Sequence, residues 1–260
     1  MGASFSLLYG AAAYAACLAT LLYLIGFSGN LLVPKSVDIG PGAPLLEAVV
    51  VDLLLLALFA LQHSVMARRG FKQWWTRVVP PAVERSTYVL ATCVVFALLF
   101  WRWVPMPAPI VWRVDSPTGA ALLWSLFGLG WVLVVISTFL IDHFELFGLR
   151  QVYAHWTDRP MPTAQFKAPL LYRYVRHPLY LGLLLSFWSA PVMTAGRLLF
   201  ALGTTAYIFL GVWLEERDLI LQFGKRYDHY RSEVGMLIPR RRRSRGKPAE
   251  ETTGMPRQAR

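Results

Sequence analysis

Long apolar stretches with few charges constrain this chain more than any other feature. Inside hydrocarbon, backbone N–H and C=O groups must bond to each other, so such stretches span a bilayer as helices of about 20 residues. At 260 residues and 56% hydrophobic, the chain is too apolar for a soluble domain. We therefore expect an all-α integral membrane protein of about six transmembrane helices. The predicted spans cover residues 5–33, 45–67, 86–104, 118–142, 178–195 and 197–214.

The distribution of Lys and Arg predicts how these spans are oriented. Basic residues gather in 68–85, in 143–177 and from 215 onward, whereas 34–44 and 105–117 hold one each. Positive residues collect on the cytoplasmic side of membrane proteins. Six spans place all three basic segments on one side together with the N-terminus. We expect both termini in the cytoplasm, with the chain in a bacterial inner membrane.

The formal charge of +11 also raises the question of a nucleic-acid partner. The positive residues lie at span ends and in a tail rather than on one basic domain, so we expect no nucleic-acid binding. Residues 1–240 are predicted to form a single transmembrane domain. Residues 241–260 are predicted to be a basic, disordered tail that touches anionic lipid. The oligomeric state stays open.

The two cysteines, Cys17 and Cys93, both fall inside predicted spans. Neither has a partner at the spacing of a redox motif or a metal site. We read both as small packed residues and expect no disulfide.

The last two predicted spans form a hairpin with charged residues at its open end. Pro178 fits a helix start, and Gly196 in the sequence "AGR" is expected to take a positive φ in the turn. Two legs of about 18 residues would each cross the bilayer once. His177 and Glu215 would then meet at one membrane face. They are either ordinary interfacial anchors or a polar pocket for a cytosolic ligand of mixed charge.

The sequence "RHPLYLG", followed by a hairpin and "EERDLILQFGKRYDHYRSEVGMLIPR", resembles the C-terminal signature of the isoprenylcysteine carboxyl methyltransferase superfamily. Residues 61–90 and 137–152 resemble a narrower branch, the methanethiol S-methyltransferases and NnrU-like membrane proteins. No Gly-rich loop follows a predicted strand, which excludes the soluble dinucleotide-type methyltransferase fold.

This resemblance implies a cytosolic pocket for S-adenosylmethionine. Aromatic rings, carboxylates and an arginine suit its adenine, ammonium, ribose hydroxyls and carboxylate. The residues implied to bind it are Tyr172, His177, Pro178, Leu179, Tyr180, Glu215 and Glu216, with Arg176 beside them.

The resemblance also implies methyl transfer to a small thiol such as methanethiol, giving dimethyl sulfide. A thiol reacts as its thiolate, so a base or cation beside it would help. His63 and His143 are the first candidates for that group, with Asp142 and Arg176 as further catalytic candidates. No histidine pair has the spacing of helical metal ligands, so we expect no metal.

The donor-binding motifs do not identify the methyl acceptor, because the same motifs occur in enzymes that methylate thiols, carboxylates or amines. Bulky residues such as Trp101, Trp103, Trp124 and Trp131 favour a small, closed pocket. The alternatives are a prenylcysteine carboxylate or a phospholipid amine as acceptor. A further alternative is a non-catalytic NnrU-like membrane protein.

Overall fold

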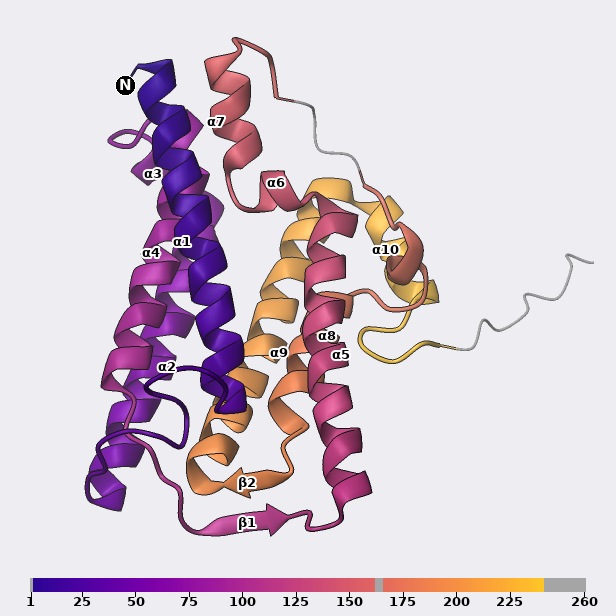
Figure 1. Ribbon diagram of the computed structural model, residues 1–260. Coiled ribbons are helices and arrows are strands. Elements are labelled where there is room, and N and C mark those ends of the chain that lie inside the picture. Colours follow the sequence, from indigo (N-terminus) through magenta and orange to yellow (C-terminus); the bar gives the residue numbers. More distant parts are fainter. Residues whose placement is uncertain (1, 162–165, 241–260) are drawn as a thin grey trace, which may run out of the picture.

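The computed structural model describes residues 2–161 and 166–240, which form a bundle of long helices standing side by side (Figure 1). The predicted tail over 241–260 lies outside the described residues. Within the described ranges, five helices are long and apolar enough to cross a membrane, which fits an integral membrane protein. They are α1 (Ala3–Gly29), α2 (Leu45–Ala67), α4 (Pro81–Arg102), α5 (Pro117–Ile141) and α9 (Ala195–Phe223).

Shorter elements join and flank these helices. One end of the bundle also carries a small antiparallel two-stranded sheet, which the sequence analysis did not predict. The shorter elements are α3 (Arg69–Trp75), β1 (Ile110–Arg113), α6 (His143–Leu146), α7 (Leu149–Trp156), the 3-10 helix η1 (Leu170–Arg173), α8 (Pro178–Trp188), β2 (Val192–Thr194) and α10 (Lys225–Glu233).

The fifth predicted span, over 178–195, is wrong in length. α8 has 11 residues, which rise about 16 Å at 1.5 Å per residue, roughly half of a hydrocarbon core. Pro191 follows shortly after the helix end and cannot donate a helical hydrogen bond. The next residues pair with β1 as strand β2. Hydropathy alone does not separate an apolar helix from an apolar turn and strand.

The predicted turn at "AGR" is also corrected. Ala195 begins α9, and the Thr194 hydroxyl caps this helix by accepting from the Arg197 backbone N–H. Gly196 does not have a positive φ. Instead it lies close to the backbone of Met106, whose carbonyl accepts its N–H at 3.0 Å. The chain reverses before α9, not within it.

α9 is longer than the predicted span 197–214, because it continues to Phe223. Glu215 and Glu216 therefore lie inside a helix rather than at its end. The last eight residues of α9 (223 − 215) extend beyond Glu215. This places the glutamate pair short of the end of α9, where Arg176, His177 and Tyr180 contact it.

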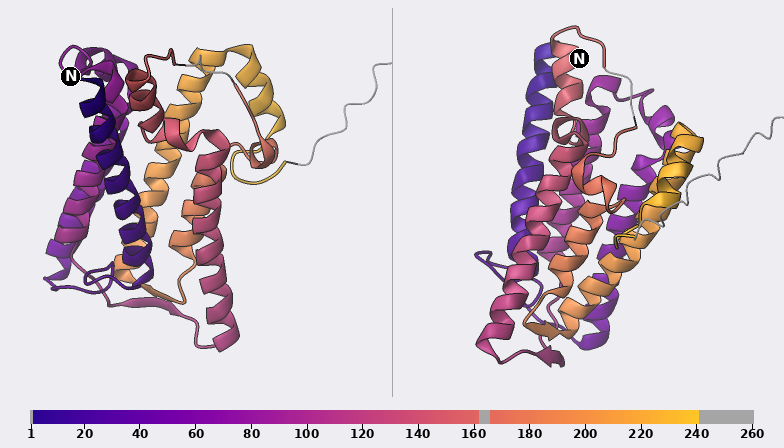
Figure 2. Two further views of the ribbon diagram at one scale, coloured as in Figure 1. Left: turned by 45° about the horizontal axis from the view of Figure 1, so that its top comes forward. Right: turned by 90° about the vertical axis from the view of Figure 1, so that its right-hand side faces the viewer.

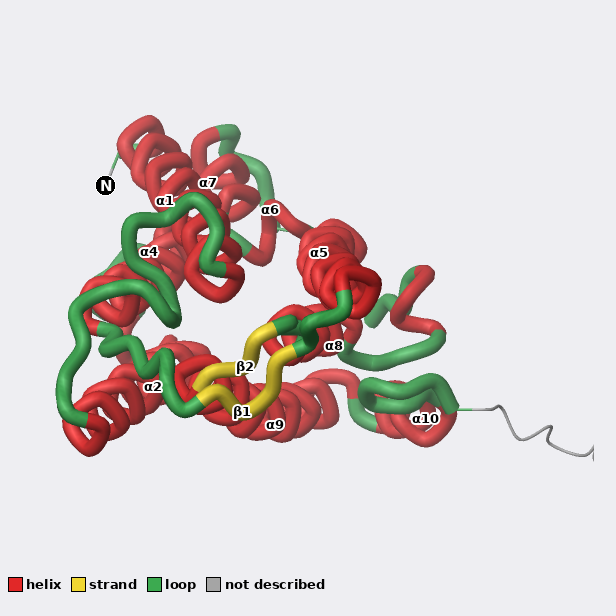
Figure 3. The backbone as a smooth tube through the Cα atoms, turned by 60° about the horizontal axis from the view of Figure 1, so that its bottom comes forward, coloured by secondary structure: helices red, strands yellow, loops and turns green. Residues whose placement is uncertain are grey.

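Buried polar contacts close the end of the bundle that carries the sheet. Figure 3 shows the backbone at this end. The Arg197 guanidinium pairs with Asp38 at 2.5 Å and also donates to the Ser28 carbonyl. The Thr194 hydroxyl donates to the same Asp38 carboxylate. These contacts hold the loop after α1 against the start of α9 and so fix where α9 begins.

The opposite end gathers the N-terminus, α3, α7 and α10 (Figures 1 and 2). α3, α7 and α10 belong to the three basic segments predicted to share one side, so the described helices of these segments lie at the same end of the bundle. An ion pair between Arg68 and Asp218 at 3.0 Å joins the first of them to α9.

α5 and α8 pack closely because two glycines face each other. A Cβ added to Gly182 would meet the Gly130 carbonyl oxygen at 2.6 Å, and one added to Gly130 would meet the Gly182 carbonyl oxygen at 2.6 Å. Close approach through small residues is typical of membrane helices. It seats α8 against a full-length span and fixes the depth at which α8 begins.

Candidate functional site

The start of α8 is held by the C-terminal segment that follows α10. Val175 forms a parallel bridge with Gly235. The backbone N–H groups of Arg176 and His177 donate to the carbonyls of Gly235 and Met236, at 2.9 and 3.1 Å. Pro178 then opens the helix at its first turn, where a missing N–H costs nothing. The "RHP" and "EVGM" segments thus fix each other.

Arg176 and His177 both reach Glu216 on α9. The Arg176 Nε donates to Glu216 Oε1 at 2.7 Å, and His177 Nε2 lies 3.1 Å from the same oxygen. The Arg176 side chain is 9% exposed and that of Glu216 is 13% exposed. Arg176 also donates to the carbonyls of Arg231 and Val234. Arg176 therefore ties α8, α9 and the end of α10 together.

Glu215 faces a different partner from its neighbour. The Tyr180 hydroxyl donates to Glu215 Oε2 at 3.0 Å, and His177 Nδ1 lies 3.9 Å from that oxygen. The Glu215 side chain is 43% exposed. Glu216 is thus neutralised by a buried cation, whereas Glu215 keeps a carboxylate that a ligand can reach.

Tyr172 joins this cluster from η1. Its carbonyl accepts a hydrogen bond from the Tyr230 hydroxyl of α10. Burial, followed by the charge of Glu215, raises the pKa of the Tyr172 phenol, which therefore stays protonated. Leu179 points elsewhere and packs against the main apolar core. The structure thus brings Tyr172, His177, Tyr180 and the glutamate pair together, with the helix start at 178–179 as their support.

His63 lies in a separate polar network on α2 and α4. Its Nε2 is 2.8 Å from the Tyr88 hydroxyl, and its Nδ1 is 3.3 Å from the Thr92 hydroxyl. The His63 ring also lies edge-on to Tyr207 of α9, with ring centroids 6.2 Å apart. Both ring nitrogens have partners, so this histidine is oriented on both sides.

His143 and Asp142 lie at the junction of α5 and α6. His143 is buried between the hydroxyls of Tyr14 and Thr138, each 2.8 Å from a ring nitrogen. The Asp142 carboxylate caps α6 through the Glu145 N–H and pairs with Arg150. The contacts that the structure describes for these two side chains hold α1, α5, α6 and α7 together. None of those contacts reaches the His177–Glu215 cluster.

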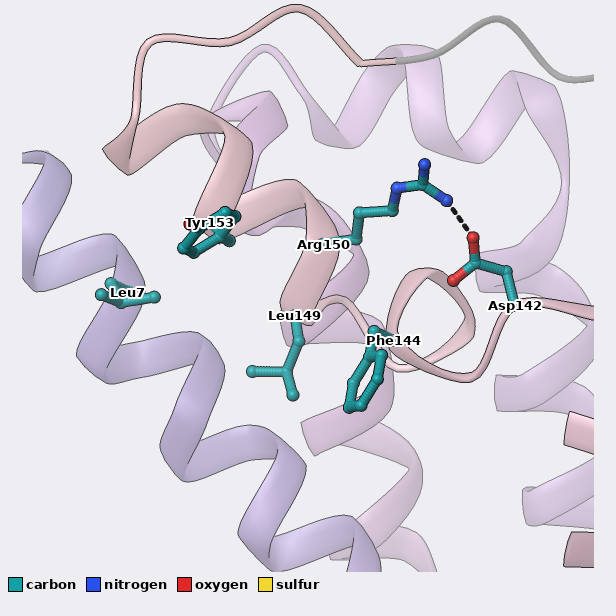
Figure 4. Close-up of a pocket in the computed structure, with 6 residues that line it drawn as sticks. All are labelled: Leu7, Asp142, Phe144, Leu149, Arg150 and Tyr153. Carbon is teal, nitrogen blue, oxygen red and sulfur yellow. Dashed lines mark hydrogen bonds and ion pairs between the residues drawn. The ribbon is translucent and has the colours of Figure 1, made fainter. Parts of the chain in front are cut away.

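Two cavities lie among these elements. The first, of about 560 Å³, contains the Asp142–Arg150 pair and shares no lining residue with the His177–Glu215 cluster (Figure 4). The second, of about 640 Å³, is lined partly by Tyr230, whose hydroxyl contacts η1. In the part of the chain that the structure describes, no group of three or more His, Cys, Asp and Glu residues is placed to hold a metal ion.

Comparison with known proteins identifies the family. A methanethiol S-methyltransferase from Mycobacterium tuberculosis is 55% identical over 234 residues, which cover 90% of this chain and 96% of that protein. The chain belongs to the methanethiol S-methyltransferase family. A second methanethiol S-methyltransferase, from Pseudomonas sp. (strain GM41(2012)), is 52% identical and covers 93% of this chain and 92% of that protein.

More distant similarity extends beyond the methanethiol S-methyltransferase family. Nurim from Bos taurus is 34% identical over 182 residues, which cover 67% of this chain and 69% of that protein. No protein-family model matches the chain. No solved structure matches it. The predicted resemblance to the methanethiol S-methyltransferase branch is confirmed.

Sequence reasoning missed several residues that build the site in this member of the methanethiol S-methyltransferase family. Gly235 and Met236 accept the backbone hydrogen bonds of the "RH" pair, and Tyr230 holds η1. All three residues lie within the quoted C-terminal motif, which could have indicated that they belong to the site. Tyr207 and its contact with the His63 network carried no signal in the sequence, because that contact depends on how α2 and α9 pack.

Proposed function

We propose that this chain methylates methanethiol with S-adenosylmethionine as donor. The identity of 50–55% to proteins named methanethiol S-methyltransferase, over about nine-tenths of the chain, carries this proposal. The methanethiolate sulfur forms a bond to the donor's methyl carbon while the bond from that carbon to the sulfonium breaks. The electron pair of the broken bond stays on the donor sulfur. The products are dimethyl sulfide and the demethylated, neutral thioether.

The residues around Glu215 fit such a donor. Its positive sulfonium and ammonium, its ribose hydroxyls and its adenine call for a carboxylate and aromatic rings in one place. Glu215 is reachable, and one of its two oxygens already accepts from Tyr180. Glu215 Oε1 is then left to accept a charge-assisted hydrogen bond from the donor. Tyr172 and Tyr180 supply phenol rings on either side of the α8 start.

Arg176, His177 and Glu216 position this carboxylate rather than compete with it. The Arg176–Glu216 pair is buried and balanced in charge, so it leaves the Glu215 charge available for a cationic ligand. His177 lies between the two glutamates, because one of its ring nitrogens is near Glu215 and the other is near Glu216. The helix start at Pro178 and Leu179 sets the height of Tyr180 against α9.

The thiol is held, in this proposal, on the side of the cluster that faces α2. His63 is oriented by Tyr88 and Thr92, and its ring lies beside Tyr207 of α9. Such a fixed polar network can orient a small nucleophile at about 3–3.5 Å from its target. His63 is the residue to which we assign this orienting role. His143 and Asp142, which join helices elsewhere, we assign to structure.

A panel of acceptors tests the proposed function. Purified protein is incubated with methyl-labelled S-adenosylmethionine and, separately, methanethiol, a prenylcysteine or phosphatidylethanolamine. We expect labelled dimethyl sulfide in the headspace and no labelled ester or amine. Faster labelling of the prenylcysteine or of the phospholipid would replace the proposed acceptor with that one.

We assign the end of the bundle that holds α3, α7 and α10 to the cytoplasmic face of a bacterial inner membrane. Lys and Arg are concentrated in the segments that contain these three helices, which supports the assignment. The helices lie at one end of the bundle (Figure 1). The donor is a cytosolic metabolite, so the Glu215 cluster must open on that side. A reporter that is active only in the cytosol, fused after residue 260, should be active. Activity from a periplasmic reporter at the same position would reverse the assignment.

A further inference from the structure

One glycine inside a membrane-spanning helix borders space that no neighbouring side chain fills. A Cβ added to Gly211 would find a single neighbour within 4 Å, the Tyr180 hydroxyl oxygen at 3.8 Å, which is ordinary van der Waals contact. By contrast, a Cβ at Gly203 on the same helix would meet the Leu56 side chain at 2.6 Å. Space for at least a methyl group therefore lies beside the Tyr180–Glu215 pair.

The position of Gly211 on α9 shows where this space leads. Gly211 is four residues after Tyr207 and four before Glu215, so the three share one face of the helix. Glu215 faces α8 through the Tyr180 hydroxyl. Tyr207 faces α2, where its hydroxyl lies 3.5 Å from the Ser64 hydroxyl. Gly211 thus lies between the proposed donor site and the network around His63.

We propose that Gly211 forms the floor of the acceptor pocket and sets the largest thiol that the enzyme accepts. This inference rests on the proposed function and adds the substrate class: unbranched alkyl thiols of one or two carbons. Tyr180 and Tyr207 form the walls of the pocket. A pocket that closely fits an alkyl group discriminates by roughly 10- to 200-fold for each methylene. Removing the open space at Gly211 should therefore change thiol selectivity strongly.

Gly211→Ala and Gly211→Val test the proposal by filling the space in two steps. For each variant, kcat/KM is measured with methanethiol, ethanethiol and 1-propanethiol, and the dissociation constant of S-adenosylmethionine is measured by calorimetry. The Ala variant should lose at least tenfold more activity toward ethanethiol than toward methanethiol. The Val variant should lose at least tenfold with methanethiol as well. The donor's dissociation constant should change less than twofold in the Ala variant.

Gly128→Val is the matched control. Gly128 also lies in a spanning helix with open space around it, but it is exposed on the outer face of α5. This variant should keep the wild-type ratio of ethanethiol to methanethiol turnover. Melting temperatures of all three variants show whether each is folded. If Gly211→Val is not folded, Gly211→Ala alone tests the proposal.

Two outcomes contradict the account in distinguishable ways. An unchanged ethanethiol to methanethiol ratio in a folded Gly211→Ala variant, with an active wild type, overturns the role of Gly211 alone. A wild-type protein that methylates none of the three thiols overturns the proposed function and this inference with it.

Discussion

The Tyr180 hydroxyl donates a hydrogen bond to Glu215 over 3.0 Å, although 35 positions separate the two residues. Successive residues of a helix point about 100° apart, since 3.6 residues make one turn. Glu215 and Glu216 therefore face different partners. Glu216 turns to the buried Arg176, while Glu215 turns to Tyr180 and stays reachable. Glu216 therefore holds neighbouring elements together, whereas Glu215 stays available to a ligand.

Replacing Arg176 by methionine should destabilise the protein. The change leaves the Glu216 carboxylate buried without its cation, and breaking a buried ion pair in this way costs about 3–5 kcal/mol. It also removes the hydrogen bonds to the end of α10. Thermal unfolding of the purified protein in detergent should show a clear fall in melting temperature. Arg217→Met, at an exposed site on α9 beside Glu216, is the control; equal melting temperatures in the two variants would contradict the packing described for Arg176.

Burial of His143 should make stability depend on pH. Burial lowers the pKa of this histidine below its ordinary value, so the folded chain holds it neutral where the unfolded chain binds a proton. Its contribution to stability is full above about pH 6.5 and is lost as the pH falls through the folded-state pKa. The melting temperature should drop as the pH falls below about 6.5. In His143→Gln, this drop should be smaller, and an unchanged pH profile would show that other groups cause it.

The two cysteines offer a test of how α1 packs on α4. Cys17 and Cys93 are free and lie side by side within a cluster around Tyr88. Mild oxidation with iodine should join them, reducing iodine to iodide and releasing two protons. Tryptic fragments cut between α2 and α4 should then migrate together until a reductant is added. Cys93→Ser supplies the control, and fragments that separate without reductant would contradict this packing.

The first four spans were predictable from hydropathy, because each is a single long helix bounded by polar or turn residues. The second span matches α2 at both ends. The first ends earlier than predicted, since Asn30 takes a left-handed conformation with φ of 55° directly after α1. Composition near Asn30 stays apolar through the loop, so hydropathy could not mark that end.

The hairpin was predictable in its partners but not in its geometry. The motif correctly joined His177 to the glutamate pair. The length of α8, however, depends on the pairing of β1 with β2. A strand of three residues is too short to be recognised from the sequence pattern. The setting of His143 likewise depends on Tyr14, 129 positions away, so no local pattern predicts that this ring is already hydrogen-bonded.

Donor affinity tests the central claim, that Tyr180, His177 and Glu215 form the donor site. Calorimetry is carried out with S-adenosylmethionine on the wild type, Glu215→Gln, His177→Ala and, as a control at an exposed site, Glu233→Gln. Loss of the charge on Glu215 removes a charge-assisted hydrogen bond of about 1.5–3 kcal/mol, which is roughly a tenfold to hundredfold weaker affinity. We expect this loss in Glu215→Gln, a similar loss in His177→Ala, and wild-type affinity in the control. Wild-type affinity in both Glu215→Gln and His177→Ala would contradict the account and return these residues to the role of membrane anchors.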